Sequence, residues 1–120
     1  MSKDRWAAVD RYIGESLVRQ GPALEAALKD SAAAGLPPIN VSPAQGKFLH
    51  ILARSLGARR ILEVGTLGGY STIWLASALP RGGRLISLEL EKRHAEIAAK
   101  NLARAGLADS VEIRVGKAIE

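Results

Sequence analysis

The stretch that decides the fold is Glu63-Val64-Gly65-Thr66-Leu67-Gly68-Gly69-Tyr70-Ser71, a glycine-rich turn between two regular segments. The apolar run at residues 61–64 before it is typical of a buried strand, and residues 70–79 after it have helical character. Glycines let the backbone turn sharply and let a ligand approach it closely. The N-terminus of the following helix offers unpaired N–H groups and a partial positive charge to an anion. The turn therefore predicts a ligand site between a strand and a helix.

Two further strand signals follow this turn. Residues 85–88 form a second apolar run, and Val111, Ile113 and Val115 alternate with polar residues as a third strand. A helical stretch at residues 91–105 separates the two. Alternation of strands and helices with short connections is typical of a parallel sheet with right-handed crossovers. We therefore expect an α/β fold with a Rossmann-like parallel sheet.

The chain before this sheet is expected to be helical. Apolar residues recur at helical spacing over residues 6–17 and again over 24–28, with a break at Gly21-Pro22. A third helix is predicted to begin after Ser42, which can cap it, with a buried stripe of Leu49, Leu52 and Leu56. We expect an N-terminal helical segment at residues 1–40 and a Rossmann-like domain at 41–120.

Composition excludes several classes of protein. The chain has 120 residues, no cysteine and a net charge of +5. Disulfides, thiolate zinc sites and cysteine nucleophiles are therefore excluded, and a cytoplasmic location is expected. No apolar run reaches the roughly 18 residues that span a bilayer, so no membrane contact is expected. Charges are interspersed and aromatics are only 4% of residues, which argues against a nucleic-acid partner.

A carboxylate after the second strand narrows the ligand class. Glu89 directly follows residues 85–88 and can accept hydrogen bonds from the hydroxyls of a ribose. The dinucleotide pattern Gly-x-Gly-x-x-Gly fails at Leu67, which disfavours a nicotinamide-dependent reductase, and no Gly-Lys-Ser/Thr phosphate loop is present. The two elements together predict an adenosine ligand that needs no pyrophosphate.

These motifs resemble those of the class I S-adenosylmethionine-dependent methyltransferases, within them the catechol and caffeoyl-CoA O-methyltransferase group. The resemblance rests on Glu63-Val64-Gly65-Thr66 with Gly69-Tyr70-Ser71, on Leu88-Glu89-Leu90, on Asn101-Leu102-Ala103-Arg104-Ala105-Gly106-Leu107, on Val115-Gly116-Lys117-Ala118 and on Val41. It covers residues 36–120 well and the preceding helices loosely. It implies methyl transfer from S-adenosylmethionine to a phenolic or catechol-like hydroxyl of a small molecule.

The resemblance also implies a set of cofactor-binding residues. The backbone of Val41 and Gly65 and the hydroxyl of Ser71 would hold the methionine end, with Thr66 lining the turn. Glu63 would lie under the loop and fix its polar network. On the adenosine side the resemblance implies Glu89 on the ribose, Leu90 against the adenine, and Gly116, Lys117 and Ala118 along the adenine edge.

The sheet of this family has seven strands, and the three strands predicted here correspond to its first three. The resemblance places the carboxylates that bind a divalent metal, and the catalytic lysine, after the fourth strand. The sequence therefore identifies no catalytic residue and no metal ligand, and we expect the N-terminal half of a methyltransferase domain at 41–120.

The alternative is a non-catalytic cofactor-binding or self-associating fragment. The outer edge of the first strand would lack a partner, and an unpaired edge favours pairing with a second chain. A homodimer is therefore expected. His50 and His94 are interpreted as structural or solvated, and Trp6 and Trp74 as core or interface residues.

Overall fold

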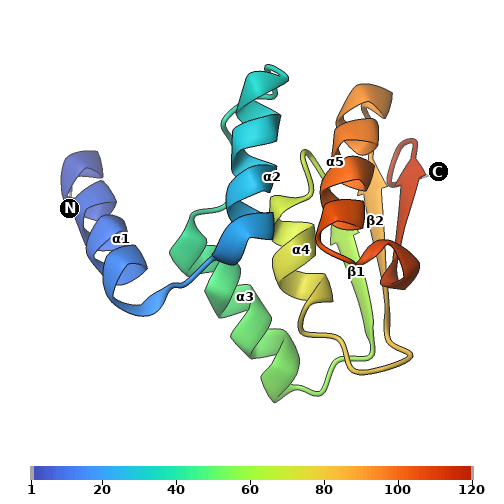
Figure 1. The fold of residues 1–120 in the computed structure, drawn as a ribbon, viewed down its shortest axis with the longest axis horizontal. Helices are drawn as coiled ribbons and strands as arrows, with labels where there is room; N and C mark the ends of the chain where they lie inside the picture. Colours follow the sequence, from blue (N-terminus) through green and yellow to red (C-terminus); the bar gives the residue numbers. More distant parts are fainter. Residues whose placement is uncertain (1, 120) are drawn as a thin grey trace.

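The computed structural model describes residues 2–119 and confirms the expected order of helices and strands (Figure 1). Three helices come first, and strands then alternate with helices. The elements are α1 (Lys3–Leu17), α2 (Gly21–Ala33), α3 (Pro43–Ser55), β1 (Arg60–Val64), α4 (Tyr70–Ala76), β2 (Arg84–Glu89), α5 (Lys92–Arg104), η1 (Ala108–Ser110) and β3 (Val111–Val115).

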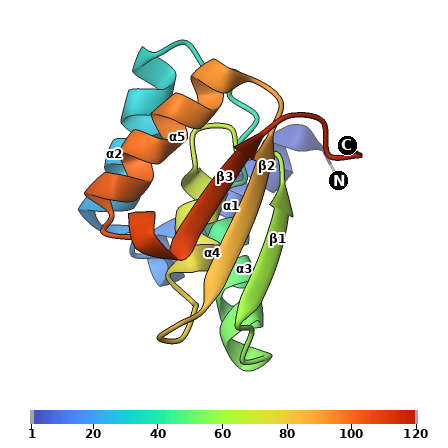
Figure 2. The same ribbon diagram turned by 90° about the vertical axis from the view of Figure 1, so that its right-hand side faces the viewer.

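The three strands form one parallel sheet in the order β1-β2-β3, which confirms the predicted α/β class. In the register, Leu62 pairs with Ile86, and Leu88 pairs with both Val64 and Arg114. The chain moves across the sheet in one direction, and right-handed crossovers then place both connecting helices on the same face. Figure 2 shows α4 and α5 together behind the strands.

This one-sided arrangement corrects the prediction that residues 61–64 form a buried strand. Ile61 and Glu63 point to the face that the helices cover. Leu62 and Val64 point to the other face and are 66% and 68% exposed. The apolar run is real, but within residues 2–119 no element covers its second face.

The core lies between the helices and the covered face of the sheet. Leu24 and Ala27 of α2 pack with Ile73 and Trp74 of α4 and with Leu102 of α5. The helix α2 thus shares its core with the strand–helix units that follow. The division at residues 40 and 41 stays a prediction.

The predicted buried stripe of the third helix was wrong in detail, and the apolar stripe predicted for the first helix is present but not buried. No residue of α1 is buried, and Trp6 is 56% exposed. Figure 1 shows α1 standing away from the body. On α3, Leu56 is 74% exposed, and Leu52 is exposed as well. The buried residues of α3 are Gly46 and Ala53.

Small residues make the contact of α3 because it approaches α4 closely. A Cβ on Gly46 would lie 2.3 Å from Cδ1 of Trp74, so the indole packs directly on the backbone of α3. The predicted start of α3 is confirmed: Oγ of Ser42 accepts a 3.2 Å hydrogen bond from the backbone N–H of Gln45, and Pro43 follows the cap.

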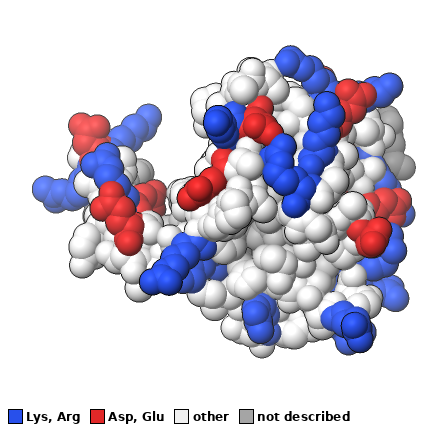
Figure 3. Space-filling model, viewed as in Figure 1, with Lys and Arg blue, Asp and Glu red and all other residues white. Residues whose placement is uncertain are grey.

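Acidic and basic side chains are interspersed on the face drawn in Figure 3, without a continuous basic stripe. No helix among residues 2–119 has the length and apolar character needed to cross a membrane.

Candidate functional site

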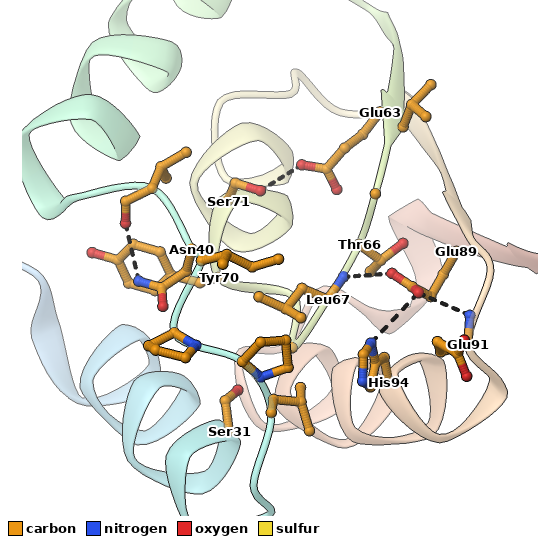
Figure 4. A pocket seen from close by; sticks show the side chains of 18 of the residues that line it. Ser31, Asn40, Glu63, Thr66, Leu67, Tyr70, Ser71, Glu89, Glu91 and His94 are labelled. Atoms are coloured by element: carbon orange, nitrogen blue, oxygen red, sulfur yellow. Dashed lines mark hydrogen bonds and ion pairs between the residues drawn. The ribbon is translucent and has the colours of Figure 1, made fainter.

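A cavity of about 620 Å³ opens at the carboxyl ends of β1 and β2 (Figure 4). Its walls are the turn at residues 65–68, the connection between α2 and α3, and the start of α5. The volume lies within the usual range for small-molecule sites. In parallel α/β sheets this is the edge at which ligands bind.

Close packing against helices explains the glycines in the turn. A Cβ on Gly68 would lie 2.0 Å from Oγ of Ser31 on α2, and a Cβ on Gly69 would lie 3.3 Å from Cβ of Ala98 on α5. Gly69 also begins α4 with φ of 87°, a conformation that favours glycine. Nδ2 of Asn101, which is buried, donates a 2.8 Å hydrogen bond to the carbonyl of Gly68. Helices α2 and α5 therefore hold the turn in place.

Glu63 organises the floor of the cavity. Its Oε2 accepts a 2.6 Å hydrogen bond from Oγ of Ser71, and its Oε1 accepts a 2.7 Å hydrogen bond from Oγ of Ser87 and another from Oγ1 of Thr72. Since Ser71 gives its proton to Glu63, its oxygen presents lone pairs and can accept from a ligand. A negative carboxylate and an accepting hydroxyl together suit a positively charged ammonium group.

Glu89 ends β2 on the opposite side of the same cavity. Its Oε1 accepts a 2.8 Å hydrogen bond from the backbone N–H of Leu67, and its Oε2 accepts a 2.9 Å hydrogen bond from the backbone N–H of Glu91. The side chain is buried, and it lies at the N-terminus of α5, where the helix dipole favours a negative charge. Nδ1 of His94 lies 3.6 Å from Oε2.

The backbone of Leu67 is adapted to this contact. Leu67 has φ of 51°, the one positive value among the non-glycine residues 2–119. A leucine in this region carries a conformational cost, commonly about 1–2 kcal/mol. The turn thereby points an N–H group at Glu89, which links the loop after β1 to the end of β2.

The cavity brings together most of the residues that the sequence singled out. Seven of them line it: Val41, Glu63, Gly65, Thr66, Ser71, Glu89 and Leu90. Gly116, Lys117 and Ala118 follow β3 and are not among the lining residues within 2–119. The backbone N–H of Gly116 donates a 2.9 Å hydrogen bond to the carbonyl of Glu89, so that segment begins beside the cavity. The ligand-binding roles of all ten residues stay predictions.

Several lining residues were not anticipated. His94 was interpreted as structural or solvated, yet it lies in the cavity wall. Its place in the first helical turn after Glu89 was the available signal. The segment after α2 contributes Leu36, Pro37, Pro38, Ile39 and Asn40. The prolines indicated the end of a helix, and nothing in the sequence indicated that this connection would cover the end of the sheet.

Tyr70 joins the site to the N-terminal helices. Burial raises the pKa of its phenol above the usual value of 10.0. Its hydroxyl donates a hydrogen bond to Oε1 of Gln20, which precedes α2.

His50 has a structural contact, because its Nδ1 lies 2.9 Å from the carbonyl oxygen of Trp74. Among residues 2–119, no three or more His, Asp or Glu side chains group so that they could hold a metal ion.

The fold and this cavity define a Rossmann-like α/β protein with a candidate ligand site at the carboxyl ends of its strands, and comparisons with known proteins specify the family. The model of the O-methyltransferase family matches residues 15–120. The chain belongs to this family.

Two curated relatives are catechol O-methyltransferases. The one from Niastella koreensis is 53% identical over 120 residues, which is all of this chain and 54% of the relative. The one from Mycobacterium tuberculosis is 54% identical over 112 residues, which is 93% of this chain and 51% of the relative. The chain thus spans about half the length of these relatives.

Solved structures share the fold closely. The O-methyltransferase from Bacillus cereus in complex with SAH superposes with a TM-score of 0.93 at 52% identity, covering 97% of this chain and 53% of that one. The O-methyltransferase TomG from Streptomyces achromogenes, in complex with SAM, gives a TM-score of 0.91 at 51% identity, covering 99% of this chain and 53% of that one.

Proposed function

We propose that the chain binds S-adenosylmethionine and forms the cofactor-binding part of an O-methyltransferase that acts on a phenolic or catechol-like hydroxyl of a small molecule. The observation that carries the proposal is the pair of carboxylates, Glu63 and Glu89, at the ends of adjacent strands in one cavity. Membership of the O-methyltransferase family and the cofactor complexes of two structural neighbours support it.

The adenosine end would lie on the Glu89 side. A carboxylate has about four lone-pair positions, and the backbone N–H groups of Leu67 and Glu91 occupy two of them. The remaining positions suit the hydroxyls of a ribose, which are hydrogen-bond donors. Leu90 lines the cavity next to Glu89 and offers an apolar surface to the adenine ring.

The methionine end would lie on the Glu63 side. Glu63 and Ser71 form an anionic, accepting surface that suits the ammonium group, and the backbone of Val41 and Gly65 borders the same region. The aliphatic side chains of Leu36 and Ile39 border the cavity from the α2–α3 connection. They would keep water away from the reacting atoms.

When bound, the cofactor supplies a methyl group on a sulfonium, which an oxygen of the acceptor attacks in line. The residues of this chain would act by holding and orienting that group, because positioning of the two reactants accounts for much of such a rate enhancement. The divalent metal that the resemblance implies finds no fitting group of ligands among residues 2–119. No step is therefore assigned to a metal held by these residues. The expected cytoplasmic location and the absence of a nucleic-acid partner stay predictions.

Calorimetric titration of the chain with S-adenosylhomocysteine tests the proposal. We expect binding, and we expect Glu89→Gln to weaken it at least about tenfold, because hydrogen bonds to a charged group contribute about 1.5–3 kcal/mol. Glu96→Gln is the matched control, since Glu96 is exposed on α5, and its affinity should equal that of the unaltered chain. Absence of binding by the unaltered chain would overturn the proposal.

A second candidate function, self-association as a homodimer, has its own observation. The outer edge of β1 has no strand partner within residues 2–119, and the strand exposes Leu62 and Val64. The other edge strand, β3, carries the exposed ion pair of Arg114 and Glu112, at 2.7 Å. Charged side chains protect an edge against further pairing.

We propose that β1 pairs with β1 of a second copy in the antiparallel sense. A register centred on Leu62 would oppose Arg60 to Val64 and so avoid a direct pair of like charges. Light scattering should show a dimer that Leu62→Lys converts to a monomer. Leu17→Lys, at an exposed apolar position on α1, should leave the dimer intact. A monomer at high concentration would contradict this candidate.

A further inference from the structure

His94 is a chemically versatile side chain in the cavity to which neither proposed half-site assigns a role. It lies in the first turn of α5, directly after the loop that follows β2. Its side chain is 22% exposed, and Nδ1 lies 3.6 Å from Oε2 of Glu89. Figure 4 shows the imidazole directed at this carboxylate.

The surroundings of Glu89 leave room for one more donor. The N–H groups of Leu67 and Glu91 approach separate oxygens of the carboxylate, so each oxygen keeps a lone pair for another partner. A buried carboxylate is stabilised by each added donor. The distance to His94 is longer than a hydrogen bond. Only a small approach of the imidazole would bring Nδ1 within hydrogen-bond distance of Oε2.

Two charged neighbours of His94, Arg93 and Glu91, do not donate to Glu89 from their side chains. Nη2 of Arg93 donates to the carbonyl of Ala34 at the end of α2, so that guanidinium joins two helices. Glu91 lines the cavity but carries a negative charge and cannot donate from its carboxylate. Of Glu91, Arg93 and His94, His94 is therefore the donor that faces Glu89.

We propose that His94 is a positioning residue for the cofactor. In this inference, which rests on the proposed function, the Nδ1–H of His94 steadies Oε2 of Glu89. The lone pair that remains on Oε1 is then held toward a ribose hydroxyl. His94 acts on the nucleoside through Glu89 and sets how well the site recognises the ribose diol.

Three variants separate this role from simple packing. His94→Leu keeps comparable bulk but has no donor, whereas His94→Gln keeps an N–H group that can reach the carboxylate. We expect His94→Leu to weaken binding of S-adenosylhomocysteine about tenfold, which corresponds to about 1.4 kcal/mol. His94→Gln should bind within about threefold of the unaltered chain, because the glutamine amide keeps an N–H donor. In a Glu89→Gln background, His94→Leu should have no further effect.

The decisive readout is a ligand without the diol. We would titrate the same variants with the 2′,3′-dideoxy analogue of S-adenosylhomocysteine. If His94 acts through Glu89 on the ribose, His94→Leu should bind this analogue as the unaltered chain does. Equal thermal unfolding of both proteins would show that the substitution leaves the fold unchanged.

The outcomes distinguish this inference from the proposed function. If the unaltered chain and His94→Leu bind S-adenosylhomocysteine equally well, the inference is overturned and the proposed function stands. The inference is also overturned if His94→Leu loses as much affinity for the dideoxy analogue as for S-adenosylhomocysteine, because His94 would then only pack against the nucleoside. An unaltered chain that binds neither ligand would overturn the proposed function and this inference with it.

Discussion

Gly68 in the turn after β1 lies against Ser31 of α2 so closely that a Cβ on Gly68 would stand 2.0 Å from Oγ of Ser31. Real Cβ atoms essentially never approach another atom this closely, so the Ser31 side chain or one of the two segments would have to shift. The contact joins the cavity to a helix that lies more than thirty residues earlier in the chain. The shape of the ligand loop therefore depends on the N-terminal helices.

The first prediction follows from this contact. Gly68→Ala should lower the free energy of unfolding by about 1–3 kcal/mol, the usual cost of overpacking, and should weaken S-adenosylhomocysteine binding. Adding Ser31→Ala removes the clashing oxygen and should restore part of the stability. Urea denaturation and calorimetry measure both effects.

Gly14→Ala is the matched control for this substitution. Gly14 lies within α1, and a Cβ there would meet nothing within 4 Å. The change should therefore be neutral or should stabilise the chain by up to about 1 kcal/mol, the usual gain in a helix. A Gly68→Ala variant as stable as Gly14→Ala would show that the contact with Ser31 does not constrain the loop.

The order of helices and strands along the chain and the parallel sheet could be predicted from the sequence, because both depend on local signals. Each local signal is recognised from residues that are adjacent in the sequence. Examples are the apolar run at 61–64, the glycine-rich turn at 65–69 and the helix cap at Ser42. The exposure of Leu62 could not be predicted in the same way. It depends on which face the crossovers cover, and this is a property of the whole sheet.

The candidate site shows the same division between local and distant information. Glu63 and Glu89 were found because each ends a strand, and strand ends of a parallel sheet meet at one edge. Ile39 and Ser31 were not found, because they reach the cavity through the packing of α2 and its connection to α3. The contact of His94 with Glu89 depends on the direction of α5, which spacing alone does not give.

A second prediction concerns the three hydroxyls that converge on Glu63. Glu63→Gln replaces one accepting oxygen by an NH₂ group, so at least one of Ser71, Thr72 and Ser87 loses its acceptor. We expect a loss of about 1–3 kcal/mol in unfolding free energy, as for other broken hydrogen bonds in buried networks. Chemical denaturation should detect it. Glu15→Gln, at an exposed site on α1, serves as control, and equal stability of the two variants would argue against the network.

A third prediction uses the phenol of Tyr70, whose pKa is raised by burial. The folded chain therefore keeps this proton to a higher pH than the unfolded chain does. In the unfolded chain, tyrosine titrates at about pH 10. The resulting stability is complete below that value and is lost as the pH rises through the raised pKa of the folded state. The unaltered chain should thus lose more stability between about pH 8 and 11 than Tyr70→Phe does.

The comparison needs one reference substitution. Tyr12 is 72% exposed on α1, so Tyr12→Phe should retain the pH dependence of the unaltered chain. At neutral pH, Tyr70→Phe should itself cost about 1 kcal/mol, because it removes the hydrogen bond to Gln20. The same pH dependence in Tyr70→Phe and Tyr12→Phe would show that burial of the phenol does not affect stability.

The last prediction concerns Leu67, whose φ of 51° serves its hydrogen bond to Glu89. Asparagine adopts this conformation more readily than leucine, and β-branched valine adopts it least readily. Leu67→Asn should therefore match or exceed the stability of the unaltered chain, and Leu67→Val should lose about 1 kcal/mol or more. Because valine would draw the N–H group away from Glu89, its affinity for S-adenosylhomocysteine should fall as well. Urea denaturation and calorimetry on the two variants test this, and a valine variant that equals the asparagine variant in both would show that the backbone conformation of Leu67 does not support the site.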